Sequence, residues 1–387
     1  MLACQKDLFY LPDDLHYLNC AYMAPLSRPV EAAGIEGIRR KRVPSSIKPE
    51  AFFEESDQVR ASFARLVNVA EPERIALIPS ASYGIASAAR NVRLSAGQNM
   101  VVVHEQFPSN IYAWRRRHAE TGAEVRTVQP PEGSTQRGER WNTHLLEAID
   151  DRTGLVALPH VHWADGTRFD LERIGARARD VGAAFIIDGT QSVGALPFDI
   201  QRLQPDALIC AGYKWLLGPY SIGAAYFGPR FDTGIPLEEN WIARRGSEHF
   251  GRLVQYQQAY QPGALRYDVG ERSNFILLPM LLAGLDLIHQ WGVEAIQSYC
   301  RTLSRDVLAD ARSLGFQLED EGWRGSHLFG LRVPTHLSIE RLQTALTALN
   351  VSASIRGSAV RLAPHVYNDT ADMEALREAL HRCAGGA

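Results

Sequence analysis

"AAFIIDGTQSVGA" at residues 183–195 and "ALICAGYKWLLGP" at residues 207–219 share one pattern, an uninterrupted apolar run followed by glycine and polar residues. A short apolar run bounded in this way is typical of a buried strand. Each run places one ionisable residue just beyond its end, Asp188 in the first and Lys214 in the second. Lysine is rarely buried unless it is paired or chemically used, so an amine between two large aromatic residues requires a reason.

Similar apolar runs without clean alternation recur along the chain, and amphipathic stretches separate several of them. This arrangement predicts an α/β fold with a mainly parallel seven-stranded sheet that helices cover on both faces. The expected strands are residues 74–79, 99–104, 123–129, 154–161, 183–188, 207–211 and 223–228. The expected helices between them are residues 82–92, 109–121, 141–150 and 170–182, and the Pro- and Gly-containing stretch 129–142 is predicted to be a surface loop.

The pattern changes after the apolar segment 275–288, which reads as a buried helix. A long helix is expected at 293–315 and a terminal helix at 370–383, with strands at 327–334 and 351–364 on either side of a helix at 338–350. We therefore predict a smaller α+β domain at the C-terminal end. The expected division is an N-terminal arm at residues 1–25, a large domain at 26–285 and a small domain at 286–387.

Composition narrows the class of protein. The 387 residues carry a formal net charge of −3, which does not favour nucleic acid or an anionic membrane as a partner. Five scattered cysteines without metal-ligand spacing indicate a reducing compartment. The N-terminal residues do not resemble a signal peptide, and segment 275–288 is too short to cross a bilayer. We expect a cytoplasmic protein.

The residues after the two strands allow more than one interpretation. Asp188 could cap a helix, bind a metal or ribose, or balance a buried cation. Lys214 could form an ordinary salt bridge with Asp188, because the carboxyl ends of neighbouring parallel strands meet at one edge of the sheet. A desolvated lysine with a lowered pKa is also what Schiff-base chemistry requires.

A third stretch, "IPSASYGIASAA" at residues 78–89, places small residues and hydroxyls where a strand ends and a helix begins. Free backbone N–H groups and the helix dipole make such a turn a phosphate site. Simple capping of the helix by Ser80 or Ser82 is the alternative.

An aspartate after one strand, a lysine after the next and a phosphate turn after an earlier one resemble the fold-type I pyridoxal-phosphate (PLP) enzymes of the aminotransferase class V group. That group includes cysteine desulfurases, kynureninase and isopenicillin N epimerase-like proteins. The resemblance extends from "YLNCAYMAPLS" (17–27) to "VRLAPHVYND" (360–369). It implies a PLP-dependent transferase fold, the cofactor pyridoxal 5′-phosphate and a small amino-acid substrate.

The resemblance also implies roles for residues around the cofactor. Lys214 resembles the lysine that forms the Schiff base, and Asp188 the aspartate that keeps the pyridine nitrogen protonated. Gln191 matches the residue that bonds the phenolic oxygen of the cofactor. Ala81 and Ser82 match the phosphate-binding turn, and Tyr213 matches the tyrosine that reaches the phosphate.

Further residues match the walls of the family's site. Phe107 in "HEQFPSN" matches the ring that stacks on the pyridine, and either His162 or Trp163 in "PHVHWADGT" matches the strand beside that ring. His160 and His162 lie on one face of a strand, which raises metal binding as a minor alternative, but no third ligand with suitable spacing is visible. Arg361 matches the arginine that binds the substrate α-carboxylate, although a surface arginine is the alternative. Asn19 and Tyr22 match the segment that lines the substrate side.

Two departures from the family bear on the reaction. The run "LNVSASIRGSAVRLAP" contains no cysteine, where desulfurases carry their nucleophile, so persulfide chemistry is not expected. Relatives supply a Gly-Thr pair to the partner subunit's cofactor, and here Glu271 stands in the threonine's place. Ser273 or Arg272 could serve instead, and a homodimer is still expected.

The site residues that the resemblance implies are common to several reactions, because they act before the reaction paths separate. An aminotransferase is the preferred function, and a kynureninase-like or other lyase or an epimerase is the alternative. A nucleotide-binding doubly wound protein is disfavoured because neither GxGxxG after the first strand nor GxxxxGK[ST] occurs. A non-catalytic PLP-binding protein is the most distant alternative.

Overall fold

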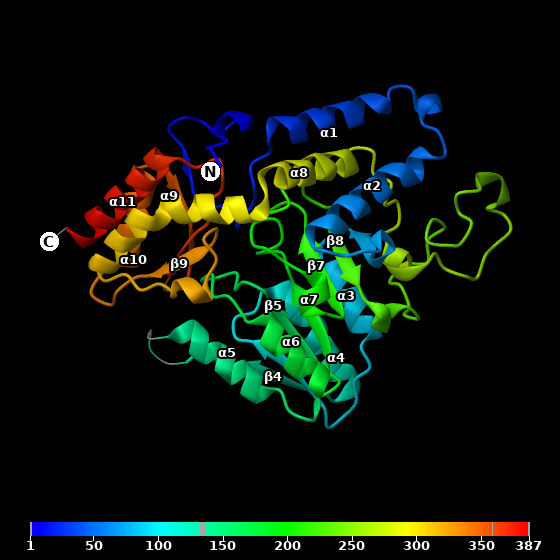
Figure 1. The fold of residues 1–387 in the computed structure, drawn as a ribbon, viewed down its shortest axis with the longest axis horizontal. Helices are drawn as coiled ribbons and strands as arrows, with labels where there is room; N and C mark the ends of the chain where they lie inside the picture. Colours follow the sequence, from blue (N-terminus) through cyan, green and yellow to red (C-terminus); the bar gives the residue numbers. More distant parts are fainter. Residues whose placement is uncertain (1, 132, 134–135, 358, 386–387) are drawn as a thin grey trace.

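A seven-stranded sheet lies at the centre of the computed structural model, which describes residues 2–131, 133, 136–357 and 359–385 (Figure 1). Its order is β2-β8-β7-β6-β5-β3-β4, and only β8 runs antiparallel to its neighbours. The prediction of a mainly parallel seven-stranded sheet is confirmed. The strands are β2 (Ile75–Ile78), β3 (Asn99–Val103), β4 (Glu124–Val128), β5 (Thr153–Pro159), β6 (Ala184–Asp188), β7 (Ala207–Ala211) and β8 (Gly223–Phe227).

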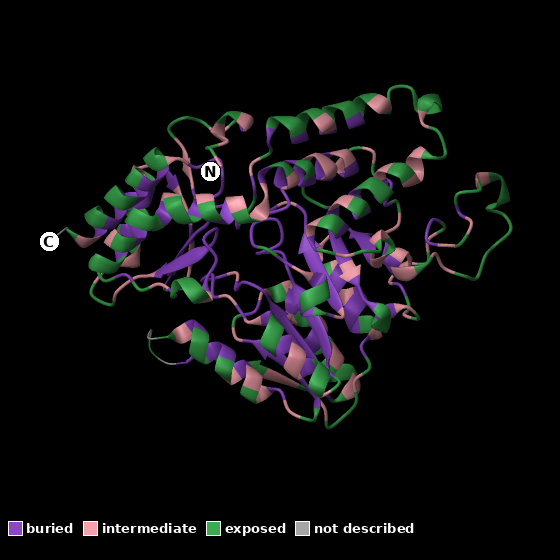
Figure 2. Ribbon diagram, in the orientation of Figure 1, coloured by how far each residue is buried: buried purple, intermediate pink, exposed green. Residues whose placement is uncertain are grey.

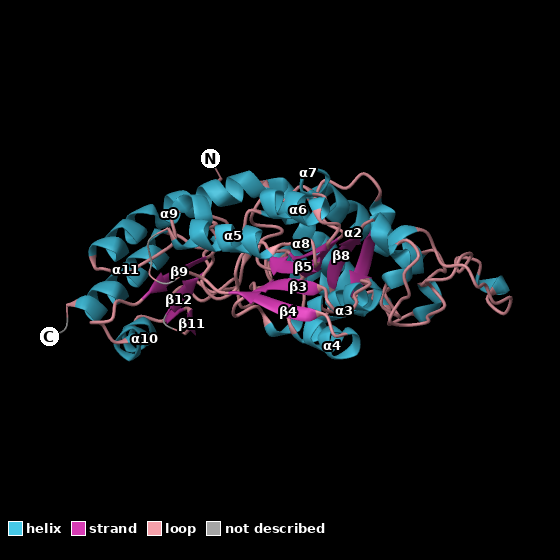
Figure 3. Ribbon diagram, turned by 90° about the horizontal axis from the view of Figure 1, so that it is seen from below, coloured by secondary structure: helices cyan, strands magenta, loops and turns pink. Residues whose placement is uncertain are grey.

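Helices cover both faces of this sheet, which explains why its strands do not alternate. Every residue of β2, β3, β5, β6 and β7 is buried, as Figure 2 shows for the central strands. Figure 3 shows helices on opposite sides of the strands. One face packs against α3 (Ala81–Asn91) and α4 (Tyr112–Thr121). The other packs against α2 (Ala51–Leu66), α5 (Arg137–Ala148), α6 (Leu171–Asp180), α7 (Ile200–Leu203) and α8 (Leu277–Trp291), and α1 (Arg28–Arg40) lies on α8.

The C-terminal residues form a second, antiparallel sheet of order β11-β12-β9 with its own apolar core. Its elements are α9 (Val293–Ser313), β9 (Phe329–Arg332), α10 (Ile339–Ala348), β11 (Ser354–Arg356), β12 (Ala359–Leu362) and α11 (Thr370–Ala384). The N-terminal residues cross this part, because β1 (His16–Tyr17) pairs in parallel with β10 (Val351–Ser352). The division into an arm and two domains at the predicted boundaries stays a prediction.

The predicted loop at 129–142 is wrong at its C-terminal end, because α5 begins at Arg137. Contacts with a distant segment stabilise this first turn: Arg137 forms ion pairs with Asp165 and Glu319, and the Gly138 N–H donates to Glu319 Oε2 at 2.9 Å. Polar composition predicts a loop, and these tertiary contacts override it. Residues 132 and 134–135 of the predicted loop lie outside the described residues.

The residues that follow the parallel strands lie at one edge of the sheet. β2 ends before Ser80, β3 before Phe107 and β6 at Asp188, while β7 leads into Lys214. Because the carboxyl ends of neighbouring parallel strands meet, residues far apart in sequence converge there.

A buried ion cluster holds the outer helix α2 to the end of the sheet. Asp268 is 1 % exposed and accepts hydrogen bonds from Arg60 Nη2 and, at 2.7 Å, from the Leu77 N–H. Its Oδ2 also forms an ion pair with Arg272, whose Nε lies 3.0 Å away. Arg60 in turn donates from Nε to the Ile75 carbonyl at 3.1 Å. Burial lowers the pKa of Arg272 to about 10, so the cluster depends on the Asp268 carboxylate.

Replacing Asp268 with alanine should lower the free energy of unfolding by about 3–5 kcal/mol, because two buried guanidinium groups lose their counter-charge. Urea denaturation measures the change. Asp57→Ala is the matched control, since Asp57 also pairs with Arg60 but its side chain is 67 % exposed, and it should cost about 0–1 kcal/mol. Equal losses in the two variants would contradict the role of the buried cluster.

Candidate active site

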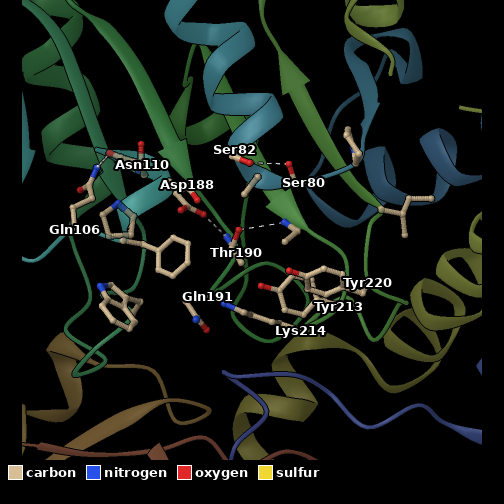
Figure 4. Close-up of a pocket in the computed structure, with 18 of the residues that line it drawn as sticks. Ser80, Ser82, Gln106, Asn110, Asp188, Thr190, Gln191, Tyr213, Lys214 and Tyr220 are labelled. Atoms are coloured by element: carbon tan, nitrogen blue, oxygen red, sulfur yellow. Dashed lines mark hydrogen bonds between the residues drawn. The ribbon is translucent and has the colours of Figure 1, made fainter. Parts of the chain in front are cut away.

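A cavity of about 230 Å³ opens at the carboxyl edge of the central sheet (Figure 4). Five strand ends contribute to it, as expected for an open α/β sheet. Eight of the sequence-predicted site residues line it: Ala81, Ser82, Phe107, Trp163, Asp188, Gln191, Tyr213 and Lys214. His162, Asn19, Tyr22, Arg361 and Ser273 are not part of its lining.

Lys214 is the buried amine of this cavity, with 6 % of its surface exposed. Its Nζ lies 5.6 Å from the centre of the Phe107 ring and 5.4 Å from that of Tyr213. Burial lowers the pKa of Lys214 to about 8, against the opposing effect of Asp188. Within the described ranges Lys214 has no carboxylate within 4.0 Å, so the interpretation as an ordinary salt bridge with Asp188 is wrong.

Asp188 faces the same cavity from the end of β6 and is 7 % exposed. It caps no helix; its Oδ1 accepts instead from the Thr190 N–H at 3.0 Å. Burial raises the pKa of Asp188, while the bonds from Thr190 and the charge of Lys214 oppose this shift. A cationic group in the cavity would therefore stabilise the ionised carboxylate.

Gln191 is held rigidly at the floor of the site. Its Nε2 donates to the Ala21 carbonyl at 3.1 Å, and its Oε1 accepts from Trp215 Nε1 at 2.9 Å. One N–H of the amide remains for a ligand oxygen. Packing therefore fixes the orientation of this amide before any ligand enters.

The N-terminus of α3 opens into the cavity through Ala81 and Ser82. Ser80 caps the helix by accepting from the Tyr83 N–H at 3.2 Å, and its Oγ lies 2.9 Å from Ser82 Oγ. The capping interpretation is thus confirmed for Ser80. Together with the helix dipole, the other N–H groups of the first turn could bind an anion in the cavity.

Aromatic rings form the walls. Phe107 and Trp163 meet edge to face with their centres 5.5 Å apart, and Tyr213 packs on Tyr220 at 4.6 Å. Burial raises the pKa of Tyr213, so its hydroxyl is a neutral donor at the same cavity as the start of α3. A flat aromatic ligand fits between such walls.

His162 and Trp163 point to different sides of their segment. The His162 ring is 1 % exposed, packs against Trp141 and lies with Nε2 3.1 Å from the His104 carbonyl. Its Nδ1 lies 3.3 Å from Asp165. The structure therefore places Trp163 at the cavity wall and His162 behind it.

Arg361 lies on β12, just outside the cavity lining, with 2 % of its surface exposed, so the interpretation as a surface arginine is wrong. It donates from Nη1 to the Trp163 carbonyl at 2.8 Å and from Nη2 to Ser354 Oγ at 3.3 Å. Asn19 Oδ1 lies 3.5 Å from the same Nη2, whereas Tyr22 is 58 % exposed. The Arg361 Nε is buried without a hydrogen-bond partner, and burial lowers the pKa of its guanidinium to about 10.

Ser273 lies in a different pocket of the chain, where Glu271, Trp241 and Phe275 also lie, and its hydroxyl donates to the Phe52 carbonyl. Its proposed contact would be with a second subunit, so a single chain does not test it. Arg272, the other candidate, is bound to Asp268.

Besides the capping Ser80, six polar residues of the cavity lining lie outside the predicted set: Gln106, Ser109, Asn110, Thr190, Tyr220 and Ser221. Thr190 donates to Asp188 through its N–H and accepts from the Ala211 N–H at 3.2 Å. Thr190, Gln106 and Asn110 could have been identified from the sequence, because they lie within three residues of predicted site residues. Tyr220 follows a Gly-Pro turn, and only the packing of the chain brings it to Tyr213.

Comparison with known proteins agrees with this geometry. Residues 49–376 match the family aminotransferase class-V. An uncharacterized aminotransferase, YcbU of Bacillus subtilis, is 28 % identical over 83 % of this chain and 82 % of its own. The isopenicillin N epimerase of Streptomyces clavuligerus is 24 % identical over 85 % and 84 %.

Solved structures share the fold. The apo cysteine desulfurase of Thermococcus onnurineus superimposes with a TM-score of 0.84 at 19 % identity and full coverage of both chains. The cystine C-S lyase C-DES, solved with its product cysteine persulfide, gives a TM-score of 0.81 at 18 % identity over 95 % and 97 % of the two chains.

The chain belongs to the aminotransferase class V family, and it is an enzyme of PLP-dependent fold type I. The predicted family, fold and cofactor, pyridoxal 5′-phosphate, are confirmed. Across the described part of the chain, no helix is long and apolar enough to span a bilayer. The predicted cytoplasmic location stays a prediction.

The residues of the cavity fit this cofactor. Four features correspond to the aldehyde, pyridine nitrogen, phosphate and ring of PLP. They are a buried amine with no carboxylate of the described residues within 4.0 Å, a carboxylate at the same cavity, a helix N-terminus and an aromatic wall. Lys214 would hold the aldehyde carbon covalently, and Asp188 would face the ring nitrogen.

The lowered pKa of Lys214 makes a prediction for the cofactor-free protein. Because only the uncharged amine is nucleophilic, its acetylation should rise with pH about a midpoint near 8, instead of the ordinary value of 10.5. Asp188→Asn should shift the midpoint down, because Asp188 stabilises the ammonium. Mass spectrometry of the acetylated peptides measures this, and labelling of the exposed Lys41 corrects for the reagent. A midpoint near 10.5 would contradict the prediction.

Proposed function

We propose that this enzyme is an aminotransferase that acts on a small α-amino acid, with Lys214 as the cofactor-binding and proton-transferring amine. One observation carries the proposal: Lys214 and Asp188 face one cavity from two adjacent strands without pairing with each other. A fold that keeps two opposite charges apart around a cavity is built to place a ligand between them.

The α-carboxylate of the substrate is assigned to Arg361. In the described residues this buried guanidinium has no carboxylate within 4.0 Å, and its Nε has no hydrogen-bond partner. A planar guanidinium binds a carboxylate through two parallel hydrogen bonds, which also orients the Cα–H bond. The bond from Arg361 to the Trp163 carbonyl fixes the clamp relative to the cavity wall.

Lys214 is assigned the proton transfer at Cα. Once bound, PLP supplies an electron sink for the negative charge that develops at Cα. An amine whose pKa is near 8 is close to the working pH, which is favourable for a general base that later returns its proton. Transamination requires the return at the cofactor carbon, whereas epimerisation requires it at Cα.

Persulfide transfer is not part of the proposal. Cys20, Cys210, Cys300 and Cys383 are buried, and no cysteine lines the cavity in the described chain. Before Arg361, Arg356 of β11 pairs directly with Ala359 of β12. Burial raises the pKa of Cys20 to about 12, which keeps this thiol protonated.

We also propose a homodimer with each site near the subunit interface. The segment between β8 and α8 exposes several large apolar side chains, which an interface would cover. They are Ile235, Trp241, Leu253, Val254 and Tyr256.

Purified enzyme should show a visible absorption band of bound PLP that borohydride abolishes, leaving a covalent adduct on Lys214. Lys214→Ala should lose the band, whereas the control Lys48→Ala, at an exposed lysine, should keep it. A panel of amino acids with and without a keto-acid acceptor then identifies the reaction. Turnover that needs no acceptor would contradict the aminotransferase proposal, and a colourless wild type would contradict the site itself.

Arg361→Ala should raise the KM for α-carboxylate substrates roughly 10- to 100-fold, because a charge-assisted hydrogen-bond pair is lost. The PLP band should be retained. Arg305→Ala, at an exposed arginine of α9, is the control and should leave KM unchanged. An unchanged KM in Arg361→Ala would reject the assignment of the clamp.

A further inference from the structure

A second cavity lies behind the site, on the other side of the segment that follows β5. Pro159 and Val161 line the cofactor cavity, whereas His160 between them lines a cleft of about 890 Å³. A smaller hollow of about 290 Å³ continues this cleft, and both include Arg168, Leu196 and Glu294 in their walls. We call the two together the rear cleft; α6, α7 and the adjoining ends of α8 and α9 surround it.

Among the arginines of the rear cleft that are at least half-buried, two lack a counter-charge in the described residues. Neither Arg168 nor Arg324 has a carboxylate within 4.0 Å among the residues that the structure describes. Arg168 is half-buried and donates from Nη2 to the Gly322 carbonyl at 2.6 Å. Arg324 is 9 % exposed, its Nε is buried without a partner, and its Nη1 makes only a long bond of 3.4 Å to the Gly325 carbonyl. Burial lowers the pKa of both guanidinium groups.

The acidic residues of the rear cleft are engaged elsewhere. Asp170 and Asp199 cap α6 and α7 by accepting backbone N–H groups. Glu172 and Glu321 pair with other arginines, Arg202 and Arg301, at 2.9 Å. In the part of the chain that the structure describes, neither the two capping carboxylates nor the exposed Glu294 has a cationic group within 4.0 Å. The walls of the rear cleft hold equal numbers of acidic and basic side chains. The candidate anion-binding groups are therefore the guanidinium groups of Arg168 and Arg324, which have no described carboxylate within 4.0 Å, and not an excess of positive charge.

Apolar side chains supply the rest of the wall. Leu196 and Phe198 are buried, and Trp323 is partly exposed. His160 is 9 % exposed, packs edge to face on Phe198 at 5.5 Å, and its Nδ1 has no hydrogen-bond partner. Burial lowers the pKa of His160 to about 3, so this ring is neutral. The unpartnered nitrogen is a further polar group without an explanation inside the protein.

We infer that the rear cleft binds a small organic carboxylate with an apolar body, separately from the substrate. The carboxylate would pair with the fork of Arg168, and the apolar body would cover Leu196 and Phe198. The volume lies in the range of small-molecule sites, and convergent polar groups on an apolar wall are their usual composition. Nothing in this inference depends on the proposed reaction.

Calorimetric titration of the PLP-loaded enzyme with phenylacetate tests the site. One saturable event is expected in the wild type, and Arg168→Ala should weaken it roughly 10- to 100-fold, because a charge-assisted pair is lost. Arg173→Ala, at a nearby exposed arginine outside the cleft, is the control and should bind as the wild type does. Glu294→Gln should tighten binding, roughly two- to fivefold, because it removes a repelling charge.

The tightening distinguishes the proposal from damage to the fold, which would only weaken binding. Arg361→Ala should retain the event, since binding in the substrate site would instead be lost in that variant. Absence of a saturable event in the wild type would overturn the proposal. Equal affinity of Arg168→Ala and Arg173→Ala, or loss of the event in Arg361→Ala, would overturn it as well.

Discussion

The site depends on one electrostatic constraint: an amine and a carboxylate are both buried at the same cavity and are kept from pairing. Burying two opposite charges without contact costs free energy that a direct ion pair would recover. Here the Thr190 N–H holds the Asp188 carboxylate, and the Lys214 amine rests between the Phe107 and Tyr213 rings. The desolvation that disfavours both charged forms also sets their pKa values, which move toward each other. The folded chain can carry this free-energy cost because the charges of the bound cofactor would offset it.

The remainder of the sheet serves to maintain this separation. β6 and β7 are hydrogen-bonded neighbours with every residue buried, so neither strand can shift without exposing apolar surface. The turn after β7 is locked by close contact, since a Cβ at Gly194 would lie 2.2 Å from the Trp215 carbonyl. At a φ of +98°, position 194 also favours glycine, and this lets the two post-strand loops approach each other. Rigid backbone therefore fixes the positions from which the Lys214 and Asp188 side chains extend.

Buried arginines occur in two kinds of environment, with a carboxylate partner and without one. Around Asp268 they find a carboxylate and anchor α2 to the sheet. Arg361 and Arg324 find none, and each lies beside a cavity wall or within a cleft. In a folded chain, buried cations without counter-charges indicate where an anion from outside is expected. The contrast between paired and unpaired arginines thus separates structural positions from ligand positions.

The sequence by itself determined the fold class and most of the site, because apolar runs mark buried strands and residues after parallel strands must meet at one edge. The positions of Asp188, Lys214 and the α3 turn follow from that rule, whereas Phe107 was predicted only from the resemblance to the family. Which side chain faces the cavity, Trp163 and not His162, depended on packing against Trp141. The start of α5 and the place of Tyr220 at the site likewise depended on contacts with residues distant in sequence. Those contacts exist only in the folded chain, and so local pattern could not reveal them.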